Sequence, residues 1–382
     1  MKKLKVMSVF GTRPEAIKMA PVVLELKKFS SEVESLVAVT AQHREMLDQV
    51  LTLFDIRPDF DLNIMSEGQT LFDITSRALL GLDKVFCAAK PDVVLVHGDT
   101  TTTFAGALAA FYHQIEVGHV EAGLRTRNKF SPYPEEMNRR LTGSLADLNF
   151  APTSTAKENL LRENVDAEKI FVTGNTVIDA LYKTVRADFK FTGEFERVDF
   201  SKRIILVTTH RRENLGEPLR QVYKALKLLV EEFPDVEIIF PVHKNPKVRA
   251  VVNEELGGLE RVYLTDPLDY EPFANLMNRA TLILTDSGGV QEEAPALGKP
   301  VLVLRDTTER PEAVDAGTVK LIGTNQEKVY GAAKLLLKDA AAYRKMAEAR
   351  SPYGDGHAAQ RIVQALLWRH GISSARPEEF FS

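Results

Sequence analysis

Residues 93–112 read VVLVHGDTTTTFAGALAAFY, and this stretch contains the pattern that decides the fold. Val93–Val96 is a short apolar run rich in β-branched residues, which predicts a strand buried on both faces. The polar turn His97-Gly98-Asp99 follows at once, and Thr101–Tyr112 then has the length and composition of a helix. A strand that passes through a polar turn into a helix is the repeating unit of a parallel α/β sheet.

The same alternation continues along the whole chain. The expected strands are Leu4–Phe10, Leu36–Thr40, Val93–Val96, Glu116–Val120, Leu148–Phe150, Ile170–Thr173, Arg203–Thr209, Val236–Pro241, Arg261–Leu264, Leu282–Thr285 and Val301–Leu304. Helical stretches such as Glu15–Phe29 and Leu71–Ala89 lie between them. We therefore expect an α/β protein of two Rossmann-like domains, each a doubly wound parallel sheet, that face one another across a cleft. The polar segment Asp188–Phe200, or the helix before it, marks the boundary.

Length and composition limit the class of protein. The chain has 382 residues, which suggests two domains at about 100–200 residues each. Lys and Arg number 49 and Asp and Glu number 53, a net charge of −4, so a dedicated nucleic-acid binder is not expected. No apolar run approaches the roughly 18 residues of a membrane span. Cys87 is the lone cysteine, which excludes internal disulfides; we expect it to be an inert core thiol and expect no cysteine-based zinc site.

Polar residues gather directly after the expected strands. In open parallel sheets, ligands bind at the carboxyl ends of the strands, so clusters at these ends predict one crevice, which we place between the two domains. The six clusters are Gly11–Glu15, His97–Asp99, Glu121–Arg125, His210–Asn214, Val242–Pro246 and Asp286–Gly289.

Two of these clusters suit an anion. Gly11-Thr12-Arg13-Pro14-Glu15 passes from a strand into a helix, and its free N–H groups with Arg13 could meet a phosphate; a tight turn with a solvated arginine is the alternative. In residues 286–293, DSGGVQEE, two glycines let the backbone approach a ligand at a helix start. Glu293 lies one turn further along and could accept hydrogen bonds from ribose hydroxyls. A capped helix start would explain Ser287 and the glycines but would leave Glu292 and Glu293 without a role.

Carboxylates and histidines supply the remaining candidates. Asp99, Glu121, Glu135 and Glu136 could serve in acid–base catalysis, although most carboxylates are simply solvated. Asp99 and Glu121 each end an apolar strand, which favours a functional role for these two. The four histidines of the clusters and strands follow no metal-site spacing, so we expect hydrogen bonding to phosphate or sugar and no metal. They are His97, His119, His210 and His243.

Other features bear on the ligand. Arg310, in the segment Arg305–Glu312, could neutralise a diphosphate, and a surface loop with internal Arg–Glu pairs is the equal alternative. The Gly-x-Gly-x-x-Gly fingerprint of dinucleotide sites is absent, so no nicotinamide cofactor is expected.

Taken together and in order, these segments resemble the non-hydrolysing UDP-N-acetylglucosamine 2-epimerase family over nearly the whole chain. The matching segments are Gly11–Lys18, Gln42–Arg44, His97–Thr100, Glu121–Thr126, Pro134–Arg139, Thr209–Asn214, Asp286–Pro295 and Arg305–Glu312. The resemblance implies a GT-B-type fold, with one domain over residues 1–172 and a UDP-binding domain over residues 173–354. It also implies that the last helix, within residues 355–382, packs back onto the first domain.

The resemblance implies interconversion of UDP-GlcNAc and UDP-ManNAc, for cell-surface polysaccharide. The C2 proton is not next to a carbonyl, so a free carbanion there would be very costly. Loss of UDP from C1 as the C2 proton leaves avoids that charge and gives 2-acetamidoglucal, to which UDP adds back. The protein must then stabilise the departing diphosphate and place acids and bases. No cofactor is required.

The resemblance also assigns roles to individual residues. Asp99, Glu121, Glu135 and His210 correspond to catalytic positions. The positions that hold substrate are Arg13, Lys18, Arg139, Ser287, Gly288, Glu293 and Arg310. A second, allosteric UDP-GlcNAc site would use Gln42, His43, Gln69, Glu136, Arg211 and His243. Gly68 and Glu45 depart from the residues common there, Arg and Gln.

We expect a cytoplasmic homodimer with no nucleic-acid or membrane partner. Three other functions share parts of this pattern: a glycosyltransferase on the same fold, a hydrolysing epimerase that releases free ManNAc, and a non-catalytic nucleotide-sugar sensor. The first would not need Asp99, Glu121 and Glu135 together, the second commonly has an attached kinase-like domain, and the third would not need intact carboxylates.

Overall fold

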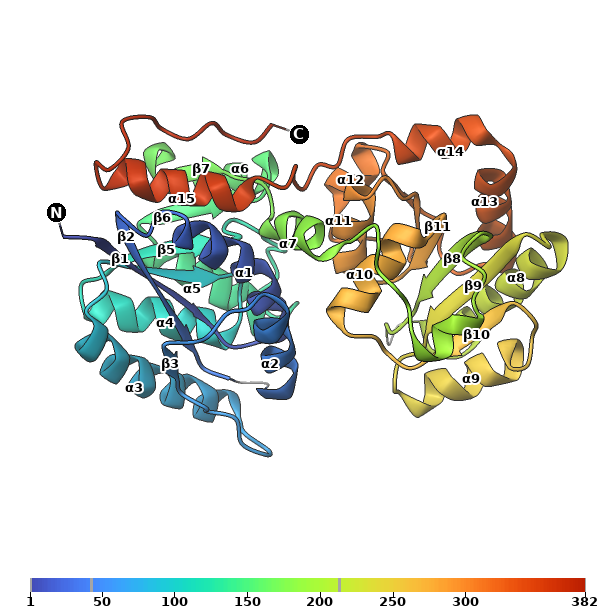
Figure 1. Ribbon diagram of the computed structural model, residues 1–382, viewed down its shortest axis with the longest axis horizontal. Helices are drawn as coiled ribbons and strands as arrows, with labels where there is room; N and C mark the ends of the chain where they lie inside the picture. Colours follow the sequence, from blue (N-terminus) through green and yellow to red (C-terminus); the bar gives the residue numbers. More distant parts are fainter. Residues whose placement is uncertain (1, 42–43, 212–213, 382) are drawn as a thin grey trace. The chain divides into compact units, whose positions relative to one another are not determined.

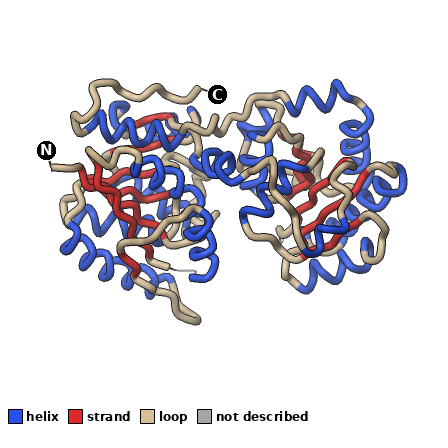
Figure 2. The backbone as a smooth tube through the Cα atoms, viewed as in Figure 1, coloured by secondary structure: helices blue, strands red, loops and turns tan. Residues whose placement is uncertain are grey.

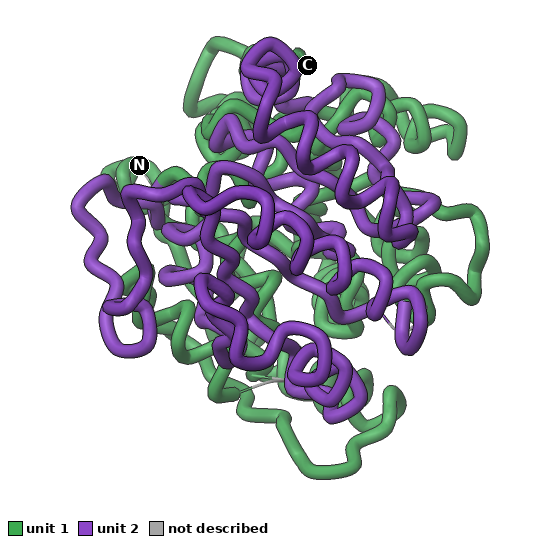
Figure 3. The backbone as a smooth tube through the Cα atoms, turned by 90° about the vertical axis from the view of Figure 1, so that its right-hand side faces the viewer, with its two compact units in different colours: residues 1–182, 353–382 green, residues 183–352 purple. Residues whose placement is uncertain are grey.

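The computed structural model, shown with its elements labelled in Figure 1, describes residues 2–41, 44–211 and 214–381. The chain forms two compact units, coloured separately in Figure 3. Unit 1 comprises Met1–Tyr182 with Tyr353–Ser382, and unit 2 comprises Lys183–Pro352. In each unit the strands, red in Figure 2, lie between helices, drawn in blue. Among the described residues, no helix combines the length and apolarity that a membrane crossing requires.

Unit 1 contains a seven-stranded parallel sheet in the order β3-β2-β1-β4-β5-β6-β7. Its strands are β1 (Leu4–Phe10), β2 (Val33–Val39), β3 (Phe60–Asp61), β4 (Val93–His97), β5 (Glu116–Val120), β6 (Leu148–Ala151) and β7 (Ile170–Val172). Its helices are α1 (Arg13–Lys27), α2 (Arg44–Leu53), α3 (Leu71–Ala89), α4 (Thr101–Tyr112), α5 (Glu135–Leu145), α6 (Ser154–Arg162), η1 (Ala167–Lys169), most of α7 (Thr176–Thr184) and α15 (Ala358–Arg369). Every residue of β4 is buried, as its apolar sequence predicts.

Unit 2 contains a six-stranded parallel sheet in the order β10-β9-β8-β11-β12-β13. Its strands are β8 (Arg203–Thr208), β9 (Val236–Pro241), β10 (Val262–Thr265), β11 (Leu282–Thr285), β12 (Val301–Val303) and β13 (Val319–Leu321). Its helices are η2 (Gly193–Arg197), α8 (Glu217–Glu232), α9 (Pro246–Leu256), α10 (Tyr270–Arg279), α11 (Gly288–Ala296), α12 (Pro311–Asp315), α13 (Gln326–Lys338) and α14 (Ala340–Ala347). The two doubly wound sheets confirm the expected fold class.

The C-terminal segment belongs to unit 1 because α7 and α15 are joined there. The carboxylate of Asp179, in α7, accepts hydrogen bonds from the N–H groups of Ala358 (3.2 Å) and Ala359 (2.9 Å). These are the first N–H groups of α15, which a helix cannot satisfy internally. Burial raises the pKa of Asp179 to about 6, against the opposing effect of those N–H groups. Unit 1 ends at Tyr182, within α7, which is the helix before the polar segment Asp188–Phe200.

Candidate active site

In each sheet the order in which successive strands are added reverses at one place, and polar clusters follow the strands at that place. In unit 1, β1 and β4 are adjacent although they are not consecutive in the chain, and in unit 2 the same holds for β8 and β11. From each such point the chain winds outward to opposite edges of the sheet. Open α/β sheets bind ligands at the carboxyl ends of the strands beside these switch points. The polar turns after β1, β4, β8 and β11 therefore define two half-sites, one on each unit.

Glu15 joins the two turns at the switch point of unit 1. Its Oε2 accepts from the N–H groups of Gly11 (3.0 Å) and Thr12 (2.8 Å), and its Oε1 accepts from the hydroxyls of Thr100 (2.7 Å) and Thr103 (3.1 Å). Burial raises the pKa of Glu15, and hydrogen bonds from Thr100, Thr12 and Gly11 oppose that rise. Glu15 thus fixes the residues that flank the ligand-facing turns and is fully occupied in doing so.

The position of Gly11 has no room for a side chain. A Cβ added at Gly11 would lie 1.9 Å from Thr40 Oγ1 and 2.7 Å from Thr102 Oγ1, two hydroxyls that are themselves hydrogen-bonded at 2.9 Å. Arg13 follows as the first residue of α1 and is only partly buried. The turn therefore places one arginine and the start of a helix at the carboxyl end of β1.

Glu121 lies at the centre of the polar cluster in unit 1. It directly follows β5 and has a positive φ of 65°. This backbone conformation is uncommon for residues other than glycine. Lys18 forms an ion pair with Glu121 Oε2, and Asn175 Nδ2 donates to the same oxygen at 2.8 Å. The Glu121 side chain is 10% exposed, so one carboxylate edge is charge-balanced in a nearly dry environment.

His97 contributes a neutral ring beside Glu121. Its Nε2 lies 3.8 Å from Glu121 Oε2, and neither ring nitrogen has a hydrogen-bond partner among the described residues. Burial lowers the pKa of His97 to about 3, so the ring is uncharged near neutral pH. His119, which burial holds at a pKa of about 4, makes a 2.7 Å hydrogen bond from Nε2 to the carbonyl of Gly98 and so supports the turn.

Asp99 is the second carboxylate of unit 1. It follows β4, the strand that pairs with β5, and its Oδ2 is bound by Arg139 Nη2. The amide of Asn138 also donates to the backbone carbonyl of Asp99 at 3.0 Å, so α5 holds this turn at two points. The Asp99 side chain is 27% exposed, which leaves it accessible to a ligand.

Glu135 and Glu136 are neighbours with different environments. Glu135 begins α5 and is partly exposed. Glu136 is fully buried and accepts from the N–H groups of Thr126 and Arg127, both at 3.0 Å. Glu136 therefore holds the loop that leads from β5 to α5, while Glu135 remains the accessible carboxylate of the two.

In unit 2 a buried carboxylate orients a histidine. Asp286, completely buried after β11, accepts from the N–H groups of His210 and Arg211, and His210 Nδ1 lies 3.0 Å from Asp286 Oδ1. Burial acts to raise the pKa of Asp286, but hydrogen bonds from His210 and from the backbone of Arg211 outweigh it and hold the pKa below its usual value. A charged Asp286 accepts a hydrogen bond from the Nδ1–H of His210, so the Nε2 of His210 points away from Asp286. The His210 side chain is 40% exposed.

The N-terminus of α11 has no side-chain cap from its N-cap residue. Ser287 occupies the N-cap position but makes no side-chain capping bond, so the first-turn N–H groups of α11 are not capped by it. A Cβ added at Gly288 would lie 3.0 Å from Glu309 Oε1, so glycine allows the segment that follows β12 to approach closely.

Several polar and charged side chains of unit 2 near this helix are paired with one another. Arg310 pairs with the buried Glu292, and Tyr270 donates to Glu293 Oε2 at 3.1 Å. Arg305 pairs with Glu309 at 2.6 Å. The internal Arg–Glu pairing that the sequence offered as an alternative is thus present, and it holds Arg310 close to the start of α11 through Glu292.

The residues expected at an allosteric site are divided between the units. Gln69 precedes α3 and accepts from the N–H of Ser66 at 3.3 Å, whereas Arg211 pairs with Glu309 at 2.9 Å in unit 2. The ring of His243 stacks on that of His210, with centroids 6.3 Å apart. Gln42 and His43 lie outside the described residues.

Sequence reasoning missed Asn175 and Tyr270 as parts of these clusters, and it noted Glu292 without its partner Arg310. Asn175 could have been found, because it follows β7 in the same way that the other polar residues follow their strands. Tyr270 had no such signal, and the partner of Glu292 could not be predicted, since both depend on tertiary contacts, with Glu293 and Arg310 respectively. Among the described residues, no group of three or more metal-capable side chains lies at either half-site.

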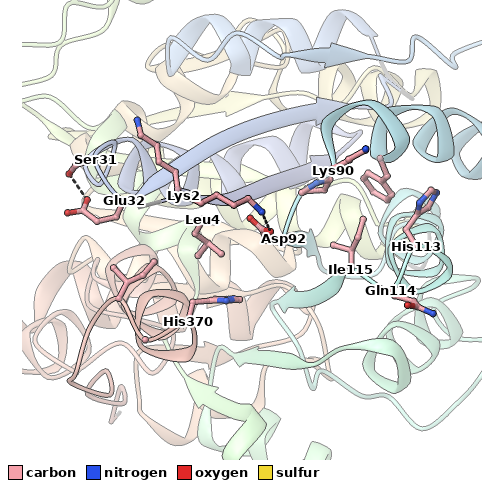
Figure 4. Close-up of a pocket in the computed structure, with 15 residues that line it drawn as sticks. Lys2, Leu4, Ser31, Glu32, Lys90, Asp92, His113, Gln114, Ile115 and His370 are labelled. Carbon is pink, nitrogen blue, oxygen red and sulfur yellow. Dashed lines mark hydrogen bonds and ion pairs between the residues drawn. The ribbon is translucent and has the colours of Figure 1, made fainter.

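A large cavity lies at the other edge of the unit 1 sheet (Figure 4). Its volume is about 1300 Å³, and its lining includes Leu4, Asp92 and Ile115, which lie at or just before the starts of β1, β4 and β5. These are amino ends of parallel strands. The cavity therefore lies at the amino edge of the sheet, whereas the polar cluster lies at the carboxyl edge. Although the cavity is large, we do not assign the catalytic site to it.

Two doubly wound sheets, each with polar side chains and a helix start at its switch point, define a GT-B-type protein. Sequence comparison identifies the family more closely: a profile described as UDP-N-acetylglucosamine 2-epimerase matches residues 25–367. The UDP-N-acetylglucosamine 2-epimerase of Bacillus subtilis (strain 168) is 62% identical over 380 residues, 100% of this chain and 99% of that one. The chain belongs to the UDP-N-acetylglucosamine 2-epimerase family.

Solved structures agree with this assignment. A crystal structure of a UDP-N-acetylglucosamine 2-epimerase is 59% identical, covers 100% of both chains and superposes with a TM-score of 0.94. The UDP-GlcNAc 2-epimerase from Neisseria meningitidis, solved bound to UDP-GlcNAc, is 51% identical and has a TM-score of 0.84, with coverage of 95% of this chain and 100% of that one.

Proposed function

We propose that this chain interconverts UDP-GlcNAc and UDP-ManNAc by eliminating UDP and adding it back. The observation that carries the proposal is the pair of carboxylates Asp99 and Glu121, which end adjacent strands and are each bound by a cation, Arg139 and Lys18. Two supported carboxylates at neighbouring strand ends can serve as acid and base on two faces of one sugar carbon. The relative from Neisseria meningitidis that binds UDP-GlcNAc supports the choice of substrate.

The chemistry proceeds in two balanced halves. A base removes the C2 proton while the C1–O bond breaks, and the bonding electrons leave with the diphosphate, which gives 2-acetamidoglucal and UDP. A proton then adds to C2 from the opposite face and a diphosphate oxygen re-forms the bond to C1. No oxidant is consumed. Because charge develops on the departing diphosphate, the largest stabilisation must come from fixed donors and cations aimed at it.

In this proposal unit 2 holds the nucleotide. The uncapped start of α11 at Ser287 and Gly288, together with Arg310, would bind the diphosphate, and Glu293 would accept from the ribose hydroxyls. His210, oriented by Asp286, presents Nε2 as a hydrogen-bond donor or acceptor for the leaving diphosphate.

Unit 1 supplies the acid–base groups. Asp99, Glu121 and Glu135 are the proposed carboxylates. Lys18 pairs with Glu121, Arg139 pairs with Asp99, and Arg13 would meet the diphosphate. The neutral, buried His97 adds no charge beside Glu121, which suits a site that must shuttle one proton at a time.

We further propose a second UDP-GlcNAc site that activates the enzyme. Gln42, His43, Gln69, Glu136, Arg211 and His243 are its candidate residues by resemblance. Reaction from UDP-ManNAc alone would then show a lag that a trace of UDP-GlcNAc removes. Simple hyperbolic kinetics from UDP-ManNAc alone would contradict the site. The same resemblance leads us to propose a cytoplasmic homodimer that supplies ManNAc units for cell-surface polysaccharide.

NMR of the enzyme with UDP-GlcNAc in deuterated water, without any acceptor, tests the main proposal. We expect UDP-ManNAc to form with deuterium at C2. A glycosyltransferase or a sensor would leave UDP-GlcNAc unchanged, and a hydrolysing epimerase would accumulate free ManNAc and UDP. Each of these results would overturn the proposal.

A further inference from the structure

A cluster of three metal-capable side chains lies on unit 1, away from the polar half-site. Asp83 and Cys87 are one turn apart on α3, and His113 is the residue that caps the C-terminus of α4. One ligand atom from each residue lies within 4.8 Å of the other two. In doubly wound units the helices run back against the strands, so the ends of α3 and α4 lie at the amino edge of the sheet. The cluster is therefore at the opposite edge from Asp99 and Glu121.

Cys87 differs here from the expectation drawn from the sequence. The thiol was expected to be an inert part of the core, but it is exposed. Its neighbours on α3 explain why: Phe86 and Val85 face the core, and the next residue along turns outward. A single cysteine was also expected to exclude a cysteine-containing metal site, yet one thiolate can combine with a histidine and a carboxylate.

The imidazole is already held in a fixed position. His113 Nε2 lies 2.8 Å from Asp83 Oδ1, and its ring packs edge-on against the buried Phe86 ring, with centroids 5.9 Å apart and planes at 89°. Its backbone N–H also bonds to the carbonyl of Ala109 at 3.2 Å and so closes the last turn of α4. Asp83 and Cys87 are both exposed, so their side chains can rotate toward a shared ion without disturbing the core.

The ligand types select a particular class of ion. Thiolate, imidazole and carboxylate are the three ligand types that Zn²⁺ takes, at about 2.0–2.3 Å, whereas Mg²⁺ and Ca²⁺ prefer oxygen alone. A thiolate and a carboxylate also balance the charge of a divalent ion, and three protein ligands leave a fourth position for water. The site lies where two helices end, at the carbonyl end of the helix dipole, which favours a cation.

We propose that Asp83, Cys87 and His113 form a binding site for a zinc-class divalent transition metal ion, separate from the acid–base residues. His113 also lines the cavity at the amino edge of the sheet, where Figure 4 labels it near Lys90 and Gln114. The ion therefore has a solvent route that does not pass the proposed substrate site.

Cobalt substitution tests this site directly, with the purified full chain freed of metal by a chelator. Because Cys87 is the lone cysteine, any thiolate-to-cobalt charge-transfer band in the near ultraviolet reports this residue alone. We expect the band to saturate at one Co²⁺ per chain and Zn²⁺ to displace it. We expect His113→Asn to weaken Co²⁺ binding by more than the roughly 10–100-fold that loss of an outer-shell partner costs. Cys87→Ser should abolish the band.

A matched control uses His357→Asn, which removes a histidine outside the cluster and should leave the titration unchanged. As an independent readout, Zn²⁺ should raise the melting temperature of the wild type but not of Cys87→Ser. Absence of the band would overturn the proposal, since Cys87 would then bind no metal ion. Equal Co²⁺ affinity in wild type and His113→Asn would also overturn it, since the thiol would then bind the ion without the imidazole.

Discussion

Asn175→Ala tests whether Glu121 works through the contacts seen around it. The amide of Asn175 donates to Glu121 Oε2 at 2.8 Å, and its own oxygen accepts from the N–H of Val177 at 3.0 Å. A hydrogen bond to a charged group contributes about 1.5–3 kcal/mol. If that bond is needed in the transition state, kcat should fall roughly 10- to 150-fold, with KM for UDP-GlcNAc changed little.

Two further variants separate positioning from folding. Asn175→Asp keeps the size and the acceptor for Val177 but replaces the donor with a like charge, so we expect a larger loss of kcat than in Asn175→Ala. Thr176→Val is the matched control, because the Thr176 hydroxyl is buried and has no hydrogen-bond partner among the described residues. We expect near wild-type kcat for it. Rates are measured by the appearance of UDP-ManNAc, and melting temperatures are recorded alongside. Wild-type kcat in Asn175→Asp would refute the reasoning.

Three other predictions follow from single residues. Asp99→Asn should abolish epimerisation while UDP binding, followed by calorimetry, stays largely intact, because the amide keeps the shape but loses basicity; near wild-type turnover would contradict the assigned role. Asp179 has its pKa raised to about 6, so the folded state binds its proton more tightly than the unfolded state does, and wild-type stability should fall as pH rises from about 4 to about 6. Asp179→Asn should lack that loss, which amounts to at most about 3 kcal/mol, in denaturant unfolding at several pH values; parallel pH profiles would contradict it. Gly11→Ala should be destabilising by at least about 1–3 kcal/mol, because its Cβ would lie 1.9 Å from Thr40 Oγ1; an unchanged melting temperature would contradict the crowding.

The long apolar strands and their polar ends could be predicted because one physical rule governs both. A strand covered on both faces, such as β4, must be apolar, and the residue after it is the first that can face a ligand. The short strands β3 and β13 escaped notice because neither is a fully apolar run: β3 has two residues, FD, and β13 reads VKL with an exposed lysine in the middle. Their pairing with β2 and β12 stabilises them.

Contacts between distant residues set the limit of sequence reasoning. The burial of Glu136, in contrast to its neighbour Glu135, depends on two backbone N–H groups about ten residues earlier. The exposure of Cys87 depends on which face of α3 meets the sheet, and the apolar residues around it left that face ambiguous. The boundary at α7 depends on the contact of Asp179 with α15, a helix 180 residues further along.

Cleavage of the bond between C1 and the diphosphate oxygen can be observed directly. UDP-GlcNAc is prepared with labelled oxygen in the bridge, and the substrate and product are recovered after partial conversion. We predict that the label moves from the bridge into the non-bridging positions of the β-phosphate, since the released diphosphate can rotate before it adds back. Label that stays entirely in the bridge of both sugars while epimerisation proceeds would contradict the account.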